Sequence, residues 1–365
     1  MAMCNGPTKL QVEAFQTVLP LNQTDPRQLR RVSPTKTFFP SILQRRLHSV
    51  LCYNKASEED SGWAMAGWIK ESLGLALLEQ PLLAGRLRRG EGVDGGLEIV
   101  SNDCGVRLIE AKIEMDLAEV VDLKGREEVE AELVFWEDID EENPQFSPLF
   151  YVQVTNFKCG GYSIGISCSL LLADPLFMAS FFKSWASIHR ALISKTDTLK
   201  KPIFYLPNLR KTGCSPTTQN CSIPSKNRGQ SLIFKMAETN LNLDTEMQKT
   251  LAMLCIEAAE SHLGTKMAMK FSVFVREPSG AIKVENCLER GLVQKPLSIV
   301  SQLTDGNWDD LGADEVCFNE ENKPACVSYW INSFSDEGLV MVIPSPKDGG
   351  SGTRIIVTTP MENVV

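Results

Sequence analysis

The chain has 365 residues, of which 43% are hydrophobic and 23% are charged, and its formal net charge is −9. This length and composition are typical of a globular protein with two compact domains, and the negative charge argues against nucleic acid as a partner because phosphate backbones are repelled. Residues 1–10 lack the pattern of a secretory signal, and no apolar run reaches the roughly 18 residues of a transmembrane helix, so we expect a cytoplasmic monomer without a transmembrane segment.

Apolar residues recur at helical spacing between residues 62 and 79, which predicts a helix that the Gln80–Pro81 pair ends. Four shorter runs have the composition of strands: 97–100, 106–110, 149–157 and 162–170. The two glycines at 160–161 predict a hairpin turn between the last two runs. We interpret the acidic run 137–142 and the basic cluster 27–31 as solvated surface or ion pairs.

A helix start follows the last of these strands. Asp174 is a typical N-cap and Pro175 suits the first helical position, so we expect a helix from there to about residue 190. Residues 200–229 are polar, contain several prolines and lack periodicity, which indicates a linker. The patterns beyond it predict one helix, a hairpin and three further strands: helix 244–261, hairpin 326–334 with 339–343, and strands 232–236, 268–275 and 354–359.

Helices mixed with hairpins indicate an α/β (α+β) fold of two domains. We expect an N-terminal domain at residues 1–199, a linker at 200–229, and a C-terminal domain at 230–365.

Three segments resemble plant acyl-CoA-dependent BAHD acyltransferases, in order and at similar spacing. Residues 71–87 read ESLGLALLEQPLLAGRL, residues 146–149 (FSPL) precede VQVTNFKCGGYSIGIS at 152–167, and KPACVSY at 323–329 precedes GLVMVIP at 338–344. The resemblance covers nearly the whole chain. It implies two chloramphenicol-acetyltransferase-like domains with a substrate channel between them.

The family's HxxxD motif corresponds to Leu170-Leu-Leu-Ala-Asp174 in this chain. In the family, the histidine is the base that deprotonates the acceptor before it attacks the acyl-CoA thioester, a task that suits a group with a pKa near neutrality. Leu170 stands at the histidine position and can neither accept a proton nor hydrogen-bond a hydroxyl group. The resemblance therefore implies that no catalytic residue of the motif is intact.

The family's aspartate has a structural role and pairs with an arginine. The resemblance gives these roles to Asp174 and Arg276, and an N-cap role for Asp174 is compatible with the pair. Either role explains why Asp174 is present although the histidine of the motif is absent.

The second family motif, DFGWG, is largely absent. Around Phe318 the sequence reads CFNEENKP, in which only the phenylalanine and the following Lys-Pro match. Arg276 is also followed almost directly by the next segment, and the chain ends at Val365 where the family has a closing helix. We therefore expect either a shortened C-terminal domain in which part of the channel wall is missing, or an incomplete coding sequence.

Other groups that carry chemistry are interpreted as structural. The candidates for the substrate channel are Leu170, Cys168, which shares its strand face, and Phe318. Cys168 is interpreted as a buried thiol. His48 and His262 are interpreted as structural, and His189 as a partly exposed structural residue. The eleven cysteines contain no CxxC pair, so we expect reduced thiols, no metal site and no bound cofactor.

Two functions remain open. In the first, the chain is a non-catalytic member that binds acyl-CoA or an acyl chain, or a fatty-acid elongation enzyme as partner. The resemblance extends to the eceriferum-type members, which assist very-long-chain fatty-acid elongation for plant waxes. For this chain it implies a cytoplasmic location, with the periphery of the endoplasmic reticulum as the alternative. In the second, it is an acyltransferase with altered chemistry that uses acyl-CoA as co-substrate and an alcohol or amine as acceptor. Loss of a general base costs about 10²–10⁴ in rate, so we favour a weak or inactive member, in acyl-lipid or specialised metabolism.

Overall fold

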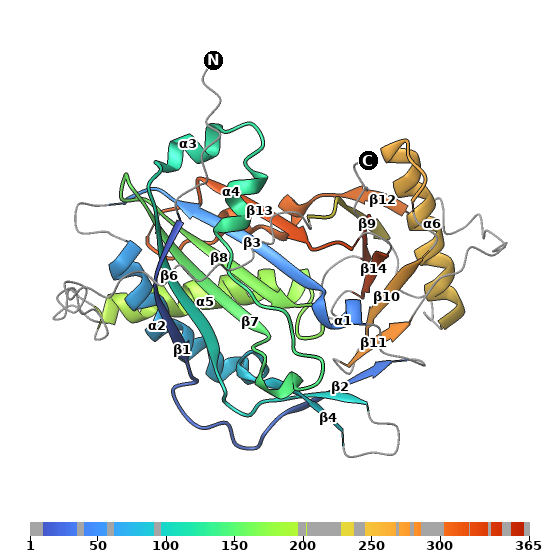
Figure 1. The fold of residues 1–365 in the computed structure, drawn as a ribbon, viewed down its shortest axis with the longest axis horizontal. Helices are drawn as coiled ribbons and strands as arrows, with labels where there is room; N and C mark the ends of the chain where they lie inside the picture. Colours follow the sequence, from blue (N-terminus) through green and yellow to red (C-terminus); the bar gives the residue numbers. More distant parts are fainter. Residues whose placement is uncertain are drawn as a thin grey trace.

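The computed structural model describes most of the chain: residues 10–34, 40–56, 62–90, 96–195, 202, 228–236, 245–267, 270–277, 281–285, 303–320, 322–334, 337–344 and 352–360. These residues form two mixed sheets with helices on their faces (Figure 1). The expected mixed α/β architecture is therefore confirmed.

The first sheet has six strands in the described part of the chain, in the order β1-β6-β7-β8-β3-β13. Neighbouring strands are antiparallel except β6 and β7. The bounds are β1 (Leu10–Val18), β6 (Val106–Ile113), β7 (Phe150–Phe157), β8 (Tyr162–Ser169), β3 (Arg46–Tyr53) and β13 (Cys326–Ile331).

The second sheet has nine strands among the described residues, in the order β12-β9-β15-β14-β10-β11-β2-β5-β4. Parallel pairs join β10 to β14 and β11 to β2. The bounds are β12 (Leu303–Gly306), β9 (Ser231–Met236), β15 (Thr353–Thr358), β14 (Gly338–Ile343), β10 (Phe271–Arg276), β11 (Ile282–Glu285), β2 (Leu29–Pro34), β5 (Leu97–Val100) and β4 (Arg86–Arg89).

Helices cover both faces of the first sheet and one face of the second (Figure 1). The described helices are α1 (Pro40–Gln44), α2 (Gly62–Glu79), α3 (Leu117–Asp122), α4 (Glu127–Glu132), α5 (Pro175–Lys195) and α6 (Thr245–Leu263). The long helices α2 and α5 share the main core with the first sheet, α3 and α4 pack on its other face, and α6 packs on the second sheet. Because both faces are covered, every position of β3, β7 and β8 is buried.

Short connecting helices complete the described structure: η1 (Pro81–Ala84), η2 (Pro144–Phe146), η4 (Trp308–Leu311) and η5 (Ala313–Glu315). Pro81 opens η1 directly after α2, so the predicted helix end is confirmed. The predicted glycine turn is also found, because β7 and β8 pair antiparallel and Gly160 has φ 86°.

The predicted hairpin of 326–334 with 339–343 is wrong. β13 pairs with β3 in the first sheet, whereas β14 lies between β10 and β15 in the second. Two apolar runs with a short connection fit a hairpin and a crossing between sheets equally well, because strand partners are chosen by long-range packing. The chain between β13 and β14 is thus a bridge between the two sheets.

The sheets do not divide at the proposed linker. β2, β4 and β5 come from the first half of the chain but belong to the second sheet, and β13 makes the opposite exchange. Most of residues 200–229 lies outside the described residues. The division at that segment therefore stays a prediction.

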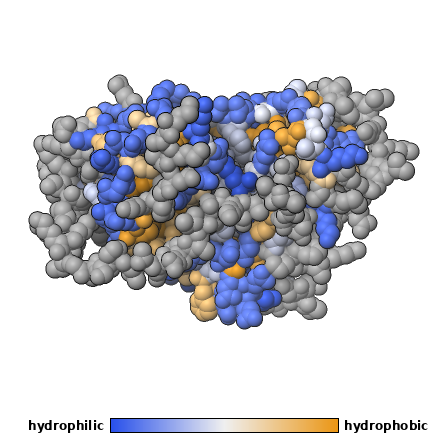
Figure 2. All heavy atoms as spheres, turned by 45° about the horizontal axis from the view of Figure 1, so that its top comes forward, coloured by the Kyte–Doolittle hydropathy of each residue, from blue (hydrophilic) through white to orange (hydrophobic). Residues whose placement is uncertain are grey.

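No helix in the described ranges has the length and hydropathy needed to span a bilayer. Among the described residues on the face shown in Figure 2, most are hydrophilic and apolar residues appear in small groups.

Candidate functional site

The chain turns sharply after β8, and this turn builds the candidate site. The carbonyl of Ser169 accepts hydrogen bonds from the amides of Leu172 (2.9 Å) and Ala173 (3.1 Å), while its hydroxyl accepts one from Leu171 (3.3 Å). The amide of Leu170 donates to the carbonyl of Arg45, 2.9 Å away. Hydrogen bonds therefore fix the backbone of the turn that precedes α5.

Asp174 holds the start of α5 and also reaches the second sheet. Its Oδ1 accepts a hydrogen bond from the amide of Phe177 at 2.9 Å, which is the N-cap interaction. Its Oδ2 accepts a hydrogen bond from Arg276, at the end of β10, in a charged pair. The guanidinium of Arg276 also lies over the ring of Phe177, 5.4 Å from its centroid. The structure thus brings together the two residues that the resemblance pairs.

A second arginine approaches the same turn from β2. Arg30 donates a hydrogen bond to the carbonyl of Leu172. Burial, and then the positive charge of Arg276, lower the pKa of Arg30. Two guanidinium groups therefore lie near the single carboxylate of Asp174.

A half-open hollow lies between this turn and the second sheet. Its cavity volume is about 10 Å³, which is room for about one water molecule. Its walls come from β2, the 170–174 turn, β10, β11 and β14: Arg30, Leu170, Leu172, Ala173, Asp174, Phe274, Val275, Arg276, Ile282 and Met341. Apolar side chains form most of this lining, and its charged groups are Arg30, Asp174 and Arg276.

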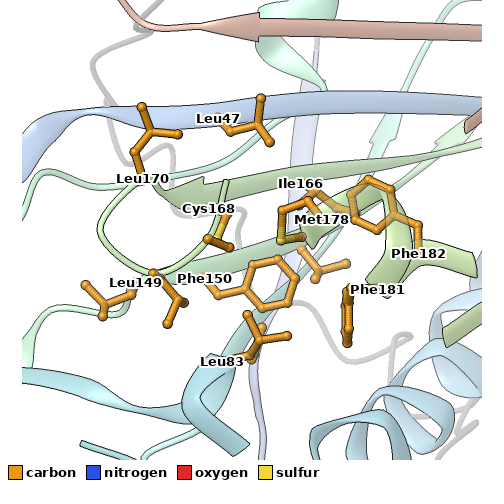
Figure 3. Packing of buried hydrophobic residues seen from close by; sticks show 14 of the residues in the cluster. Leu47, Leu83, Leu149, Phe150, Ile166, Cys168, Leu170, Met178, Phe181 and Phe182 are labelled. Atoms are coloured by element: carbon orange, nitrogen blue, oxygen red, sulfur yellow. The ribbon is translucent and has the colours of Figure 1, made fainter. Parts of the chain in front are cut away.

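Leu170 lines this hollow and is 1% exposed. Figure 3 shows it just beyond the end of β8, near Leu47 of β3, whereas Phe150 and Phe181 lie deeper in the packed cluster. An aliphatic side chain at this point offers no proton acceptor. Both carboxylate oxygens of Asp174 already accept hydrogen bonds, one from the backbone of α5 and one from Arg276.

The other two candidates for the substrate channel do not line this hollow. Cys168 is fully buried, and its Sγ donates to the carbonyl of Ser169 at 3.6 Å. Burial raises its pKa to about 12, so it is a neutral thiol rather than a nucleophile. Phe318 is 1% exposed and packs edge-on against Trp185, with ring centroids 5.0 Å apart. A channel role for either residue stays a prediction.

None of the three histidines lines the hollow. His48 is buried and stacks on Trp330, with centroids 5.2 Å apart, and burial lowers its pKa to about 3. His262 is about half exposed, 3.8 Å from the carboxylate of Asp305.

The expectation of a partly exposed His189 is wrong, because its exposure is 0%. It faces α2, where its Nδ1 hydrogen-bonds the hydroxyl of Ser72 at 2.9 Å, and burial lowers its pKa to about 3. A single histidine in a helix gives no signal of which face it occupies, whereas the surrounding apolar residues of α5 do.

Arg30 is the site residue that sequence reasoning missed. It belongs to a basic cluster interpreted as solvated surface or ion pairs, yet it is partly buried and lines the hollow. The placement depends on the pairing of β2 with β11, which joins segments far apart in the sequence. Among the described residues, no group of three or more His, Cys, Asp or Glu side chains is arranged to hold a metal ion.

Comparison with known proteins agrees with this architecture. The model of the Transferase family matches residues 39–260, more than half of the chain. The chain belongs to the BAHD acyltransferase family. Vinorine synthase has a similar structure, with a TM-score of 0.50 and 15% identity over 97% of this chain and 95% of that one. At this identity, the likeness concerns the fold alone.

Relatives of two kinds are similar in sequence. An ECERIFERUM 26-like protein of Arabidopsis thaliana is 30% identical over 37% of this chain and 34% of its own length. A hydroxycinnamoyltransferase of Narcissus pseudonarcissus is 36% identical over 34% and 28%. The chain thus spans about a third of the length of these two relatives. ECERIFERUM 2 of Arabidopsis thaliana is 24% identical over 67% of this chain and 70% of that protein.

Proposed function

We propose that this BAHD-family protein does not transfer acyl groups by the family's base mechanism, and that it binds an acyl ligand as an accessory protein of acyl-lipid metabolism. The observation that carries the proposal is the buried aliphatic side chain of Leu170 in the wall of the hollow, beside Asp174 and Arg276. This is the position that the resemblance gives to the catalytic histidine.

The surroundings support loss of the base rather than its replacement. His48 and His189 are buried elsewhere in the fold, and Cys168 is a neutral buried thiol. A neutral alcohol attacks a thioester poorly without a base, and the missing contribution is about 10²–10⁴ in rate. Asp174 keeps its cap and its arginine, which are structural tasks independent of proton transfer.

Binding needs less than catalysis does. Apolar walls and a few polar anchors suffice to hold a ligand. Phe274, Ile282 and Met341 supply such walls, and Arg30 and Arg276 supply cationic groups beside them. An acyl chain with an oxygen-rich head group has the matching chemistry, and its binding requires the walls of the hollow to move apart, because the present cavity of about 10 Å³ holds about one water molecule. The names of the ECERIFERUM relatives and the eceriferum-type resemblance support a role near very-long-chain fatty-acid and wax synthesis, with an elongation enzyme as a candidate partner.

The test combines binding with turnover on the same protein. Wild type is titrated with acyl-CoAs of increasing chain length while its thermal unfolding is followed, and release of the CoA thiol is then measured with alcohol acceptors. We expect stabilisation by long-chain acyl-CoA without acceptor-dependent thiol release. A Leu170→Phe substitution, which places a larger side chain in the wall where the ligand would enter, should abolish the stabilisation, whereas the volume-conserving Leu170→Met control should keep it.

A second function has support from the family itself, whose relatives include the hydroxycinnamoyltransferase. Acceptor-dependent thiol release by wild type would favour that alternative, an acyltransferase with altered chemistry. Absence of stabilisation by any acyl-CoA would reject the ligand-binding part of the proposal.

A further inference from the structure

Two cysteines from distant parts of the chain lie opposite each other in the first sheet. Cys52 in β3 and Cys326 in β13 are direct partners in the antiparallel register. Opposed residues of such strands have Cα atoms roughly 4.5–5.5 Å apart, which lies inside the range of about 4.4–6.8 Å that a disulfide requires. The backbone therefore permits a bond between these side chains.

The two thiols are already in contact. The Sγ atoms of Cys52 and Cys326 interact as a hydrogen-bonding pair, and both are free thiols. Cys52 is 0% exposed, whereas Cys326 is partly exposed at the edge of the cluster under α3 and α4. A small reagent from solvent thus meets Cys326 first.

The difference in exposure assigns Cys326 as the attacking thiol and the buried Cys52 as the resolving thiol. The hydrogen bond with Cys52 lowers the pKa of Cys326, and the same bond together with burial raises the pKa of Cys52. Thiolates are the reactive form towards oxidants, and a sulfenic acid condenses with a neighbouring thiol.

We propose that Cys52 and Cys326 are a reversible oxidation site that takes a peroxide as its oxidant and forms a disulfide between β3 and β13. The Cys326 thiolate attacks one peroxide oxygen, the O–O bond breaks, and hydroxide leaves, so that Cys326 becomes a sulfenic acid. The sulfur of Cys52 then displaces the sulfenic hydroxyl, and the thiol proton leaves with it as water. In sum, two thiols and one hydrogen peroxide give one disulfide and two waters.

This site is separate from the hollow. Cys52 lies near the end of β3 that is paired with Ser163, whereas the Leu170 turn follows the other end, where Arg46 pairs with Ser169. The bond would join β13, the strand that the second half of the chain contributes to the first sheet, to its neighbour. Oxidation would thus link the first residue of β13 covalently to β3 within the first sheet, without changing the lining of the hollow.

The test uses the full chain in its reduced, folded form. Hydrogen peroxide is added, the remaining thiols are blocked with N-ethylmaleimide, and the digest is analysed by mass spectrometry before and after dithiothreitol. We expect a linked peptide pair that contains Cys52 and Cys326, lighter by two hydrogens than the separate peptides and released by the reductant.

Three variants control the assignment. Cys326→Ser should lose the link and leave Cys52 reduced, and Cys52→Ala should leave a sulfenic acid on Cys326 that dimedone traps. Cys104→Ser, which changes an exposed cysteine elsewhere, should keep the link. Folded wild type in which peroxide oxidises Cys104 but leaves both Cys52 and Cys326 reduced would overturn the proposal. So would a Cys326 that oxidises without linking to Cys52.

Discussion

Two carboxylates in this protein each hold arginines, in regions of opposite character. Asp174 divides its oxygens between the first turn of α5 and Arg276, at the edge of the half-open hollow. Glu130 of α4 is 1% exposed and accepts from Arg126 at 3.0 Å, Arg228 at 2.7 Å and Ser328 at 2.5 Å, in the packed layer on the opposite face of the first sheet.

The comparison separates two roles of an acidic side chain: pairing with other side chains and capping the backbone of a helix. Glu130 joins α4, Arg228 and β13 through side chains alone, by two charge pairs and a hydrogen bond from the hydroxyl of Ser328. One of the two hydrogen bonds that Asp174 accepts comes from the backbone of α5, and this bond needs neither an arginine nor a histidine. Asp174 therefore keeps a structural role although Leu170 stands at the histidine position.

The largest effect that we expect is a loss of stability in acid, and it arises in both regions. His48 lies on the Glu130 side of the first sheet, with Arg228 among the charges that act on it, and His189 lies on the α2 and α5 side. Burial lowers both pKa values from 6.5 to about 3. The stability that the two neutral, buried imidazoles contribute is fully present above pH 6.5. It is lost as the pH falls towards 3, because in this range only the unfolded chain binds protons at these histidines.

Between pH 7 and pH 5, each histidine should lower the free energy of unfolding by about 2 kcal/mol. Urea unfolding of wild type at the two pH values measures the sum. His48→Gln and His189→Gln should each remove about half of the dependence, and equal losses in wild type and the double variant would show that other groups carry it.

The next effect distinguishes the carboxylates. Glu130→Ala should lower the free energy of unfolding by about 3 kcal/mol, at the low end for a broken buried pair because Arg126 and Arg228 keep part of their hydration. Their side chains are 38% and 30% exposed. Denaturant unfolding measures the change, and Glu127→Ala on the same helix is the matched control, with little expected effect. If Glu130→Ala lowered the free energy of unfolding by less than Asp174→Ala does, the expected order of the two carboxylates would be reversed.

Asp174 should respond in two separable steps. Asp174→Asn keeps an oxygen for the cap but loses the charge pair with Arg276, for an expected loss of about 1–2 kcal/mol. Asp174→Ala also loses the cap, which adds about 1 kcal/mol. The two variants are compared by denaturant unfolding, and an equal loss in both would mean that the cap contributes nothing.

Local signals were sufficient for the parts of this fold that local chemistry decides. Helical spacing predicted α2, capping residues predicted the start of α5, and glycines predicted the turn between β7 and β8. Partners across the fold were not predictable in the same way. The bridge from β13 to β14 resembled a hairpin, and Arg30 resembled a surface residue, because both depend on contacts between segments far apart in the chain.

The central claim is that Leu170 leaves the hollow without a base. The most direct measurement is the rate of CoA thiol release from an acyl-CoA with an alcohol acceptor, for wild type, Leu170→His and the non-basic control Leu170→Gln. We expect acceptor-dependent release close to background from wild type and Leu170→Gln, and a rate at least about ten-fold above that level in Leu170→His. Efficient release by wild type that Leu170→His leaves unchanged would contradict the account and indicate that another group of this chain supplies the base.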